Sequence, residues 1–106
     1  MKKFNLEIWP GRNAIMGNVA QDNSAFISTF RVQANEYQNP DVKMMKIAFD
    51  FAVGLLQSDF QEVELTESSA SVTYEEGGEN EPHEVVTAEK INAYLTAAGY
   101  QRRMPV

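Results

Sequence analysis

The side chains that could do chemistry gather in one acidic stretch, residues 75–84. It holds the only histidine of the chain, His83, and no lysine or arginine. Its five acids are Glu75, Glu76, Glu79, Glu81 and Glu84. Their spacing is irregular, whereas calcium loops place their ligands at defined alternate positions. The stretch therefore does not match a calcium site.

A catalytic base needs a rigid support, and the glycines and proline around His83 are typical of a loop. We interpret His83 as a surface residue without a catalytic role. A metal site formed by Glu79, Glu81 and His83 would lack both the required spacing and stiffness. We therefore expect no metal and no cofactor. The acidic stretch is interpreted either as a solvated loop or as a docking loop for a basic partner.

Other catalytic constellations are missing from the sequence. The chain has no cysteine, so thiol catalysis, disulfides and thiolate metal sites are excluded. It has neither a phosphate-binding glycine loop nor a nucleophile elbow. Asp50 lies between two phenylalanines, but Lys46 is one helical turn away, so we expect an exposed, weakly paired charge. We predict that the protein is not an enzyme.

A second candidate site lies at the end of the first predicted strand. Trp9 and Arg12 flank a Pro-Gly turn, and tryptophan and arginine are enriched at the energetic centres of protein interfaces. In a regular strand over residues 3–9, Trp9 points away from the apolar Phe4, Leu6 and Ile8. Trp9 then either lies under a cover on the second sheet face or is exposed for a partner.

The element that must position these groups is a helix over residues 40–57. Apolar residues occupy most of its circumference, far more than the stripe of a surface helix. Asn39 is the expected N-cap, followed by Pro40 in the first turn. Gly54 falls inside the helix, where a close packing contact would explain it. One flank should pack on a sheet, and either the last helix or a second copy of the chain should cover the other.

Alternating and periodic patterns supply the remaining elements. Strands are predicted over residues 3–9, 14–20, 25–34, 61–66 and 70–76, and a second helix over residues 87–98. Gly17 indicates a bulge or a close backbone approach, and Val63 and Leu65 should point inward. The expected fold is α+β, with a three-stranded antiparallel meander and a hairpin packed on the central buried helix, in the order βββαββα. Residues 1–106 should form a single domain whose tail, about residues 100–106, is flexible.

Composition limits the classes of partner. The net charge is −6, from 15 acidic and 9 basic residues, so direct binding to nucleic acid is not expected. The apolar part of the helix is too short and too charged to span a bilayer, which needs about 20 residues. We expect no signal peptide, no membrane and a cytoplasmic location. The lack of disulfides fits a reducing compartment.

The leading hypothesis is a small acidic interaction protein without catalytic activity. It would act as an inhibitor or adaptor, of the kind that phages and mobile elements use against defence systems. Its partner would be a basic protein, with nucleic-acid-handling proteins as one candidate class. Two alternatives stay open: a ligand-binding protein or enzyme with a pocket between sheet and helix, and a homodimer joined through the central helix.

Overall fold

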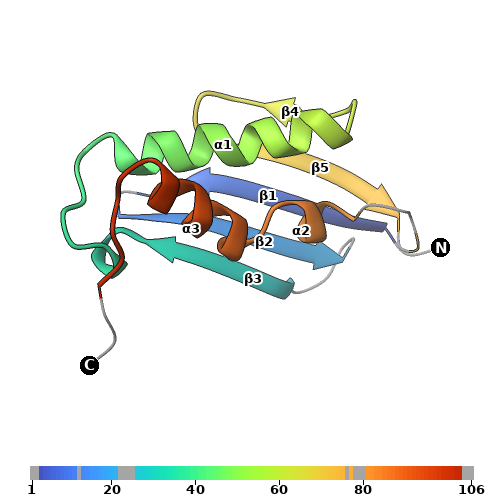
Figure 1. Ribbon diagram of the computed structural model, residues 1–106. Helices are drawn as coiled ribbons and strands as arrows, with labels where there is room; N and C mark the ends of the chain where they lie inside the picture. Colours follow the sequence, from blue (N-terminus) through green and yellow to red (C-terminus); the bar gives the residue numbers. More distant parts are fainter. Residues whose placement is uncertain (1–2, 12, 22–25, 76, 78–80, 104–106) are drawn as a thin grey trace.

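The computed structural model of the chain describes residues 3–11, 13–21, 26–75, 77 and 81–103 (Figure 1). The described residues form one antiparallel sheet with the strand order β3-β2-β1-β5-β4. Its strands are β1 (Lys3–Pro10), β2 (Ala14–Gln21), β3 (Phe26–Gln33), β4 (Glu64–Leu65) and β5 (Ala70–Glu75). The helices are η1 (Ala34–Glu36), α1 (Met44–Asp59), α2 (Pro82–Val85) and α3 (Ala88–Ala97). The predicted α+β class is confirmed.

The sheet differs in detail from the predicted meander and separate hairpin. β5 pairs with β1 along six residue pairs, so the later strands extend the same sheet on the far side of β1. The predicted order also lacks α2, a short helix that begins at a proline. Proline is favoured in the first helical turn because its fixed φ suits a helix and its missing N–H is not needed there.

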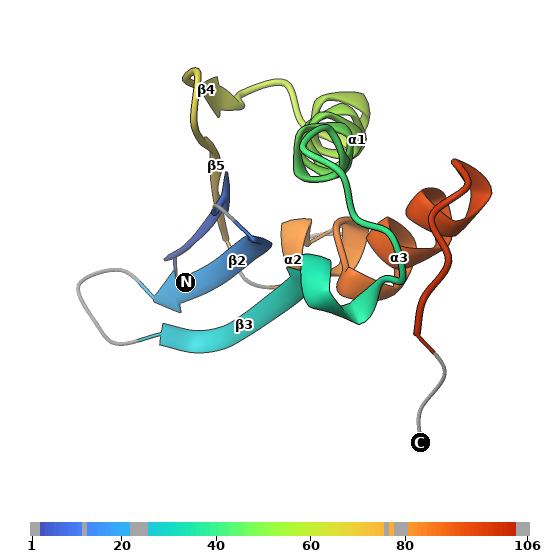
Figure 2. The same cartoon turned by 90° about the vertical axis from the view of Figure 1, so that its left-hand side faces the viewer.

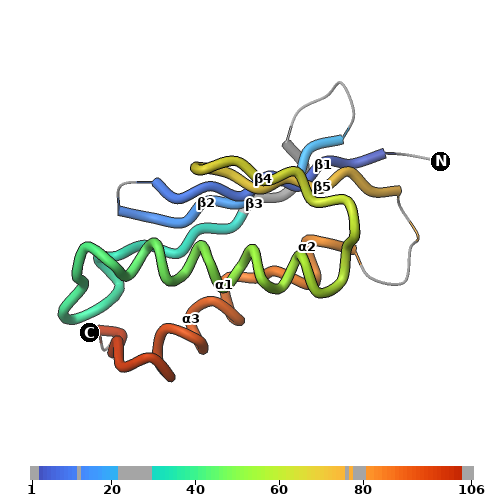
Figure 3. Tube along the Cα trace, turned by 90° about the horizontal axis from the view of Figure 1, so that it is seen from above, coloured from blue at the N-terminus to red at the C-terminus, as the bar shows by residue number. Residues whose placement is uncertain are grey.

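All three α-helices cover the same face of the sheet, as Figure 2 and Figure 3 show from two directions. Alternation along the strands decides which side chains meet them, because successive residues point to opposite faces. In β1, Phe4, Leu6 and Ile8 are buried, whereas Asn5 and Glu7 are exposed. The covered face therefore holds the hydrophobic core, together with the buried side of α1 and the inner sides of α2 and α3.

Helix α1 begins at Met44, so the prediction of a start at Pro40 with Asn39 as N-cap was wrong. The Asp41 side chain accepts a hydrogen bond of 3.0 Å from the backbone N–H of Lys43. This local bond to a residue two positions ahead competes with helical hydrogen bonding and makes a turn. The helix therefore starts after Lys43 and ends at Asp59.

The second flank of α1 packs against α3 of the same chain. The rings of Phe51 and Tyr94 stack with centroids 4.1 Å apart and planes 10° apart. Offset stacking of this kind adds about 0.5–1.5 kcal/mol to the burial of the rings. The structure also corrects our explanation of Gly54, because a Cβ atom there would meet nothing within 4 Å.

The segment after α1 is less regular than predicted. β4 contains only Glu64 and Leu65, and the side chain of Leu65 is exposed rather than turned inward. Within the predicted loop of residues 77–83, Pro82 and His83 belong to α2. Val85 and Val86 are buried, so this short helix contributes to the core.

The described part of the tail is joined to the chain just before α1. The N–H of Gln38 donates to the carbonyl of Gln101 at 2.8 Å, and the N–H of Arg103 donates to the carbonyl of Glu36 at 2.7 Å. Between them, Tyr37 and Arg102 form an isolated antiparallel bridge. These bonds hold residues 101–103 beside the end of β3.

Candidate functional site

The sheet face opposite the helices has no cover among the described residues, and we call it the open face (Figure 2). Strand alternation gives its members, which are all exposed or half-buried. They are Lys3, Asn5, Glu7, Trp9, Ala14, Met16, Asn18, Ala20, Arg31, Gln33, Ser71, Thr73 and Glu75. Most side chains on this face are small or polar, so its few large side chains are the first candidates for contact with a partner.

Three of the large side chains form one row across adjacent strands. Trp9 of β1 lies opposite Met16 of β2, and Met16 lies opposite Arg31 of β3. We call them the Trp9–Met16–Arg31 row. Directly opposite side chains in antiparallel strands have Cβ atoms about 4.5–5.5 Å apart, close enough for contact. Trp9 and Met16 are half-buried and Arg31 is exposed, as the sequence predicted for the orientation of Trp9.

A pocket of about 650 Å³ opens at the Arg31 end of this row. Open-face residues of β2 and β3 form one wall, and the chain around η1 and the tail forms the other. The lining residues are Gly11, Asn13, Ala14, Met16, Arg31, Gln33, Ala34, Asn35, Pro40 and Arg103. Among the described residues, this lining includes two arginines, three amide side chains and no acid. We call it the arginine pocket.

The two arginines differ in how they are held. The Nε atom of Arg103 donates to the carbonyl of Tyr37 at 3.1 Å. Among the described residues, the Arg31 side chain takes part in no hydrogen bond or ion pair. The nearest acid in sequence, Glu36, accepts from the N–H of Gln33 and lies 3.9 Å from Arg102.

A buried tyrosine supports the wall of the pocket. Tyr37 is fully buried, and its hydroxyl donates to the side-chain oxygen of Asn92 in α3. Burial raises the pKa of the Tyr37 phenol above its ordinary value, although the charge of Arg102 acts in the opposite direction. The carbonyl that binds Arg103 therefore belongs to a residue fixed in the core.

The acidic stretch is divided between the two faces of the sheet. Glu75 lies on the open face, where it pairs in register with Lys3. Glu81 and Glu84 belong to the α2 segment on the helix side. Three further predicted contact residues, Arg12, Glu76 and Glu79, lie outside the described residues.

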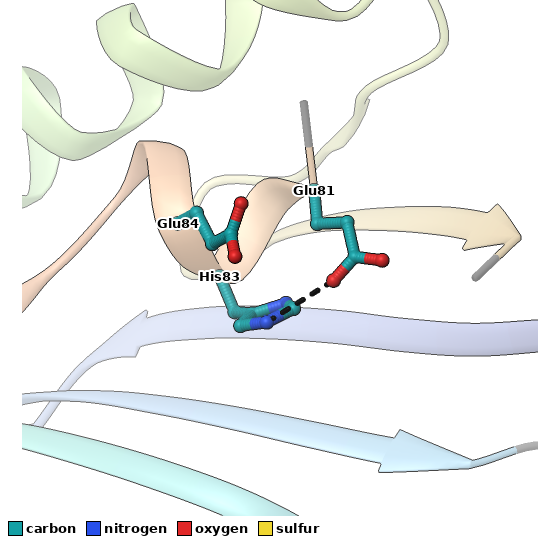
Figure 4. Close-up of side chains that lie close together, drawn as sticks. All are labelled: Glu81, His83 and Glu84. Atoms are coloured by element: carbon teal, nitrogen blue, oxygen red, sulfur yellow. Dashed lines mark ion pairs between the residues drawn. The ribbon is translucent and has the colours of Figure 1, made fainter. Parts of the chain in front are cut away.

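Figure 4 shows Glu81, His83 and Glu84 side by side. The Nε2 atom of His83 lies 3.3 Å from a carboxylate oxygen of Glu81, whose other oxygen accepts from the N–H of Gly77 at 3.1 Å. On its other side, the Nδ1 atom of His83 lies 2.9 Å from the hydroxyl of Tyr74. His83 is thus half-buried and anchored in α2, which corrects its interpretation as a surface loop residue.

The tyrosine in this network is strongly perturbed. Burial, together with the negative charges of Glu81 and Glu84, raises the pKa of the Tyr74 phenol to about 12. In the tautomer that carries its hydrogen on Nε2, His83 donates to the Glu81 carboxylate and accepts at Nδ1 from the Tyr74 hydroxyl. The Tyr74 ring also stacks on Phe4, with centroids 5.5 Å apart.

One nitrogen of His83 and the carboxylates of Glu81 and Glu84 could in principle hold a metal ion, because their ligand atoms lie within 4.8 Å of one another. Both ring nitrogens of His83 already have protein partners. A metal ion bound through either nitrogen would have to break one of these contacts. The cluster is therefore better explained as the network that fixes α2 on β5.

The two candidate regions lie at opposite ends of the sheet. Glu75 is paired with Lys3 at the start of β1, and Trp9 lies six residues further along that strand. At about 3.3 Å per residue, this places them about 20 Å apart. The structure does not bring Trp9 and the acidic stretch into one site.

Met16, Arg31 and Arg103 were missed as site residues. The alternation in residues 25–34 places Arg31 and Val32 on opposite faces of the sheet, so the orientation of Arg31 could be predicted from the sequence. The row itself needed the register of β1, β2 and β3, and Arg103 needed the pairing of the tail with Tyr37. Neither pairing has a signal in the local sequence.

Comparison with known protein families, curated proteins and solved structures found no match for this chain. Among the described residues, no helix has the length and apolar character needed to cross a membrane. The proposals below therefore rest on the geometry and charge of this chain.

Proposed function

We propose that the protein is a non-enzymatic interaction protein that binds a protein partner through the open face of its sheet. The Trp9–Met16–Arg31 row carries this proposal. Tryptophan, methionine and arginine are enriched at protein interfaces relative to other surfaces. Here the three lie side by side on adjacent strands, on a face that no described element covers.

The polar groups elsewhere support a role without catalysis. His83 uses both ring nitrogens in contacts that fasten α2. Asp50, the acid that we considered as a catalytic candidate, is exposed and pairs with Lys46 at 2.8 Å, as expected from the sequence. An exposed pair of this kind is worth about 0.2–1 kcal/mol and leaves the carboxylate in water.

The charge of the chain favours a basic partner. A net charge of −6 attracts positively charged surfaces during the diffusional encounter, before contacts form. An inhibitor or adaptor that docks on a basic protein, such as one that handles nucleic acid, is the function class that we propose. The small size and the acidic charge of the chain support this class, which includes the inhibitors that phages and mobile elements use.

Site-specific photo-crosslinking in the source cells tests the proposal. A photo-crosslinking amino acid at Asn18, on the open face, should capture a partner, whereas one at Gln57, on the exposed side of α1, should not. Substituting Trp9→Ala in the Asn18 variant should lower the yield about tenfold or more, because a central interface residue contributes about 2 kcal/mol.

Lys46→Ala is the matched control, since it changes an exposed residue on the other side of the molecule. It should leave the yield unchanged. Equal capture from Gln57, or a yield that Trp9→Ala does not reduce, would contradict binding through the open face.

A further inference from the structure

We propose that the arginine pocket binds a carboxylate presented by an acidic segment of the protein partner. This inference rests on the proposed function and names the chemistry of one contact within it. Its starting point is an imbalance of charge. The chain has more acids than bases, yet the described residues that line the pocket include two arginines and no acid.

The arginines have unused hydrogen-bonding capacity. A guanidinium group has five N–H donors. Arg103 uses its Nε–H on the carbonyl of Tyr37, and among the described residues Arg31 uses none. The terminal N–H groups of both side chains are left to bind a ligand. Arginine matches the two oxygens of a carboxylate with parallel hydrogen bonds, which makes such pairs directional and strong.

The position of Arg103 is set before a ligand arrives. Its backbone N–H binds the carbonyl of Glu36, and its Nε–H binds that of Tyr37, a residue with no exposed surface. A side chain held in this way loses less conformational freedom on binding than a free surface arginine. The amide groups of Asn13, Gln33 and Asn35 add neutral donors around the same opening.

Nucleic acid is the weaker candidate for this pocket. A phosphate chain gains its affinity from many cations that each neutralise one phosphate. The pocket supplies two cations among the described residues, too few to neutralise a run of phosphates. A carboxylate of an acidic segment satisfies the pocket, and basic surfaces elsewhere on the same partner are still attracted by the net charge of −6.

Nuclear magnetic resonance titrations of the full chain test the inference with defined probes. A capped hexaglutamate peptide should shift the guanidinium Nε–H signals of Arg31 and Arg103 at about 100 mM salt, where charges are screened beyond about 10 Å. Capped hexaglutamine, inorganic phosphate and hexathymidylate are the comparison ligands. The hexaglutamate peptide should bind at least about fivefold more tightly than each of them.

Two charge-matched variants separate the pocket from the overall charge. Arg31→Gln should weaken hexaglutamate binding about five- to tenfold, and Arg31→Lys should weaken it less, because lysine keeps the charge but not the planar fork. Lys46→Gln removes the same charge from α1 and should change binding less than twofold. Arg31 is exposed, so its variants should keep the wild-type circular dichroism spectrum.

Several results would overturn the inference: no binding of hexaglutamate, equal binding of hexaglutamine, tighter binding of phosphate or hexathymidylate, or equal losses in Arg31→Gln and Lys46→Gln. The outcome is separable from that of the proposed function. Crosslinks from Asn18 without hexaglutamate binding would reject only the carboxylate pocket. Hexaglutamate binding without crosslinks from Asn18 would reject only the docking role of the open face.

Discussion

The two faces of the sheet are built from the same strands but differ in role: one packs in the hydrophobic core and the other is not covered by a helix among the described residues. On the covered face, Leu6, Ile8 and Ile15 have no exposed surface and contact the helices. On the open face, their neighbours Glu7, Trp9 and Met16 have no helix above them. Because alternate residues point to opposite sides, one face can be selected for stability while the other is free to vary with a partner.

The difference also shows where polar groups are tolerated. On the covered face, Tyr74, His83 and Glu81 bind one another at the margin, and the buried hydroxyl of Tyr37 is bonded to Asn92. Burying a polar group without a partner costs about 1–3 kcal/mol in proteins. On the open face polar groups can bind water instead, and within the described part of the chain the Arg31 side chain has no hydrogen bond or ion pair.

The largest expected effect comes from a core residue in β1. Leu6→Ala should lower the free energy of unfolding by about 2–5 kcal/mol, because it removes buried methyl groups and leaves a cavity. Asn5→Ala, one residue away on the open face, should change it by less than about 0.5 kcal/mol. Urea denaturation followed by circular dichroism measures both values.

A similar loss in both variants would mean that the open face is also packed against something, for example a second copy of the chain. Light scattering on the wild-type protein would then show a mass above that of the monomer. Equal small losses would mean that the covered face is not the core.

A smaller loss of stability is expected at Gly17 of β2, because the ring of Phe30 in β3 fills the space above this glycine. A Cβ atom at Gly17 would lie 2.0 Å from the ring of Phe30, so a side chain occupies this space rather than the bulge or close backbone approach that the sequence suggested. Gly17→Ala should destabilise the protein by about 1–3 kcal/mol, since the ring must shift within the core. Thermal unfolding of the variant provides the measurement.

Gly54→Ala is the matched control, because the same added methyl group meets only open space. It should stabilise α1 by about 0.5–1 kcal/mol through reduced backbone freedom. If Gly17→Ala is neutral, the ring of Phe30 does not cover that strand as the structure has it.

Periodicity predicted the two faces well. The alternation in β1 assigned Phe4, Leu6 and Ile8 to the core and Trp9 to the other side, because each pattern needs only local sequence. The start of α1 was misjudged since Asn39 and Pro40 look like a helix start, while the hydrogen bond from Lys43 to Asp41 delays it. The strand predicted over residues 61–66 was too long, since β4 contains only Glu64 and Leu65; Val63 packs partly buried against the core as expected, whereas Leu65 is exposed.

The candidate site was less predictable than the fold. Trp9 could be identified from its type and its strand position. Its neighbours Met16 and Arg31 depend on the register of three strands, and the second arginine of the pocket comes from the tail, about 70 residues away in sequence from Arg31. Composition predicted one acidic loop, either solvated or docking on a basic partner, but folding places Glu75 and Glu81 on opposite sides of the sheet.

The smallest expected effect tests the polar margin of the covered face. Tyr74→Phe keeps the ring on Phe4 and removes the hydroxyl that binds His83. It should cost about 1 kcal/mol at neutral pH, the usual net value of one hydrogen bond. Urea denaturation at a series of pH values measures this cost and its dependence on pH.

The pH dependence has a definite sign. The folded protein keeps the Tyr74 proton up to a pKa of about 12, whereas a tyrosine in the unfolded chain loses it near pH 10. The folded state therefore binds more protons in this interval, and stability falls as the pH rises from about 10 to 12. Wild-type protein should lose more stability than Tyr74→Phe over this interval, although solvent near the partly exposed ring weakens the effect. If the free energies of unfolding of the wild type and of Tyr74→Phe fell in parallel with pH, the Tyr74 hydroxyl would lie in water. The margin of the covered face would then be as accessible to solvent as the open face.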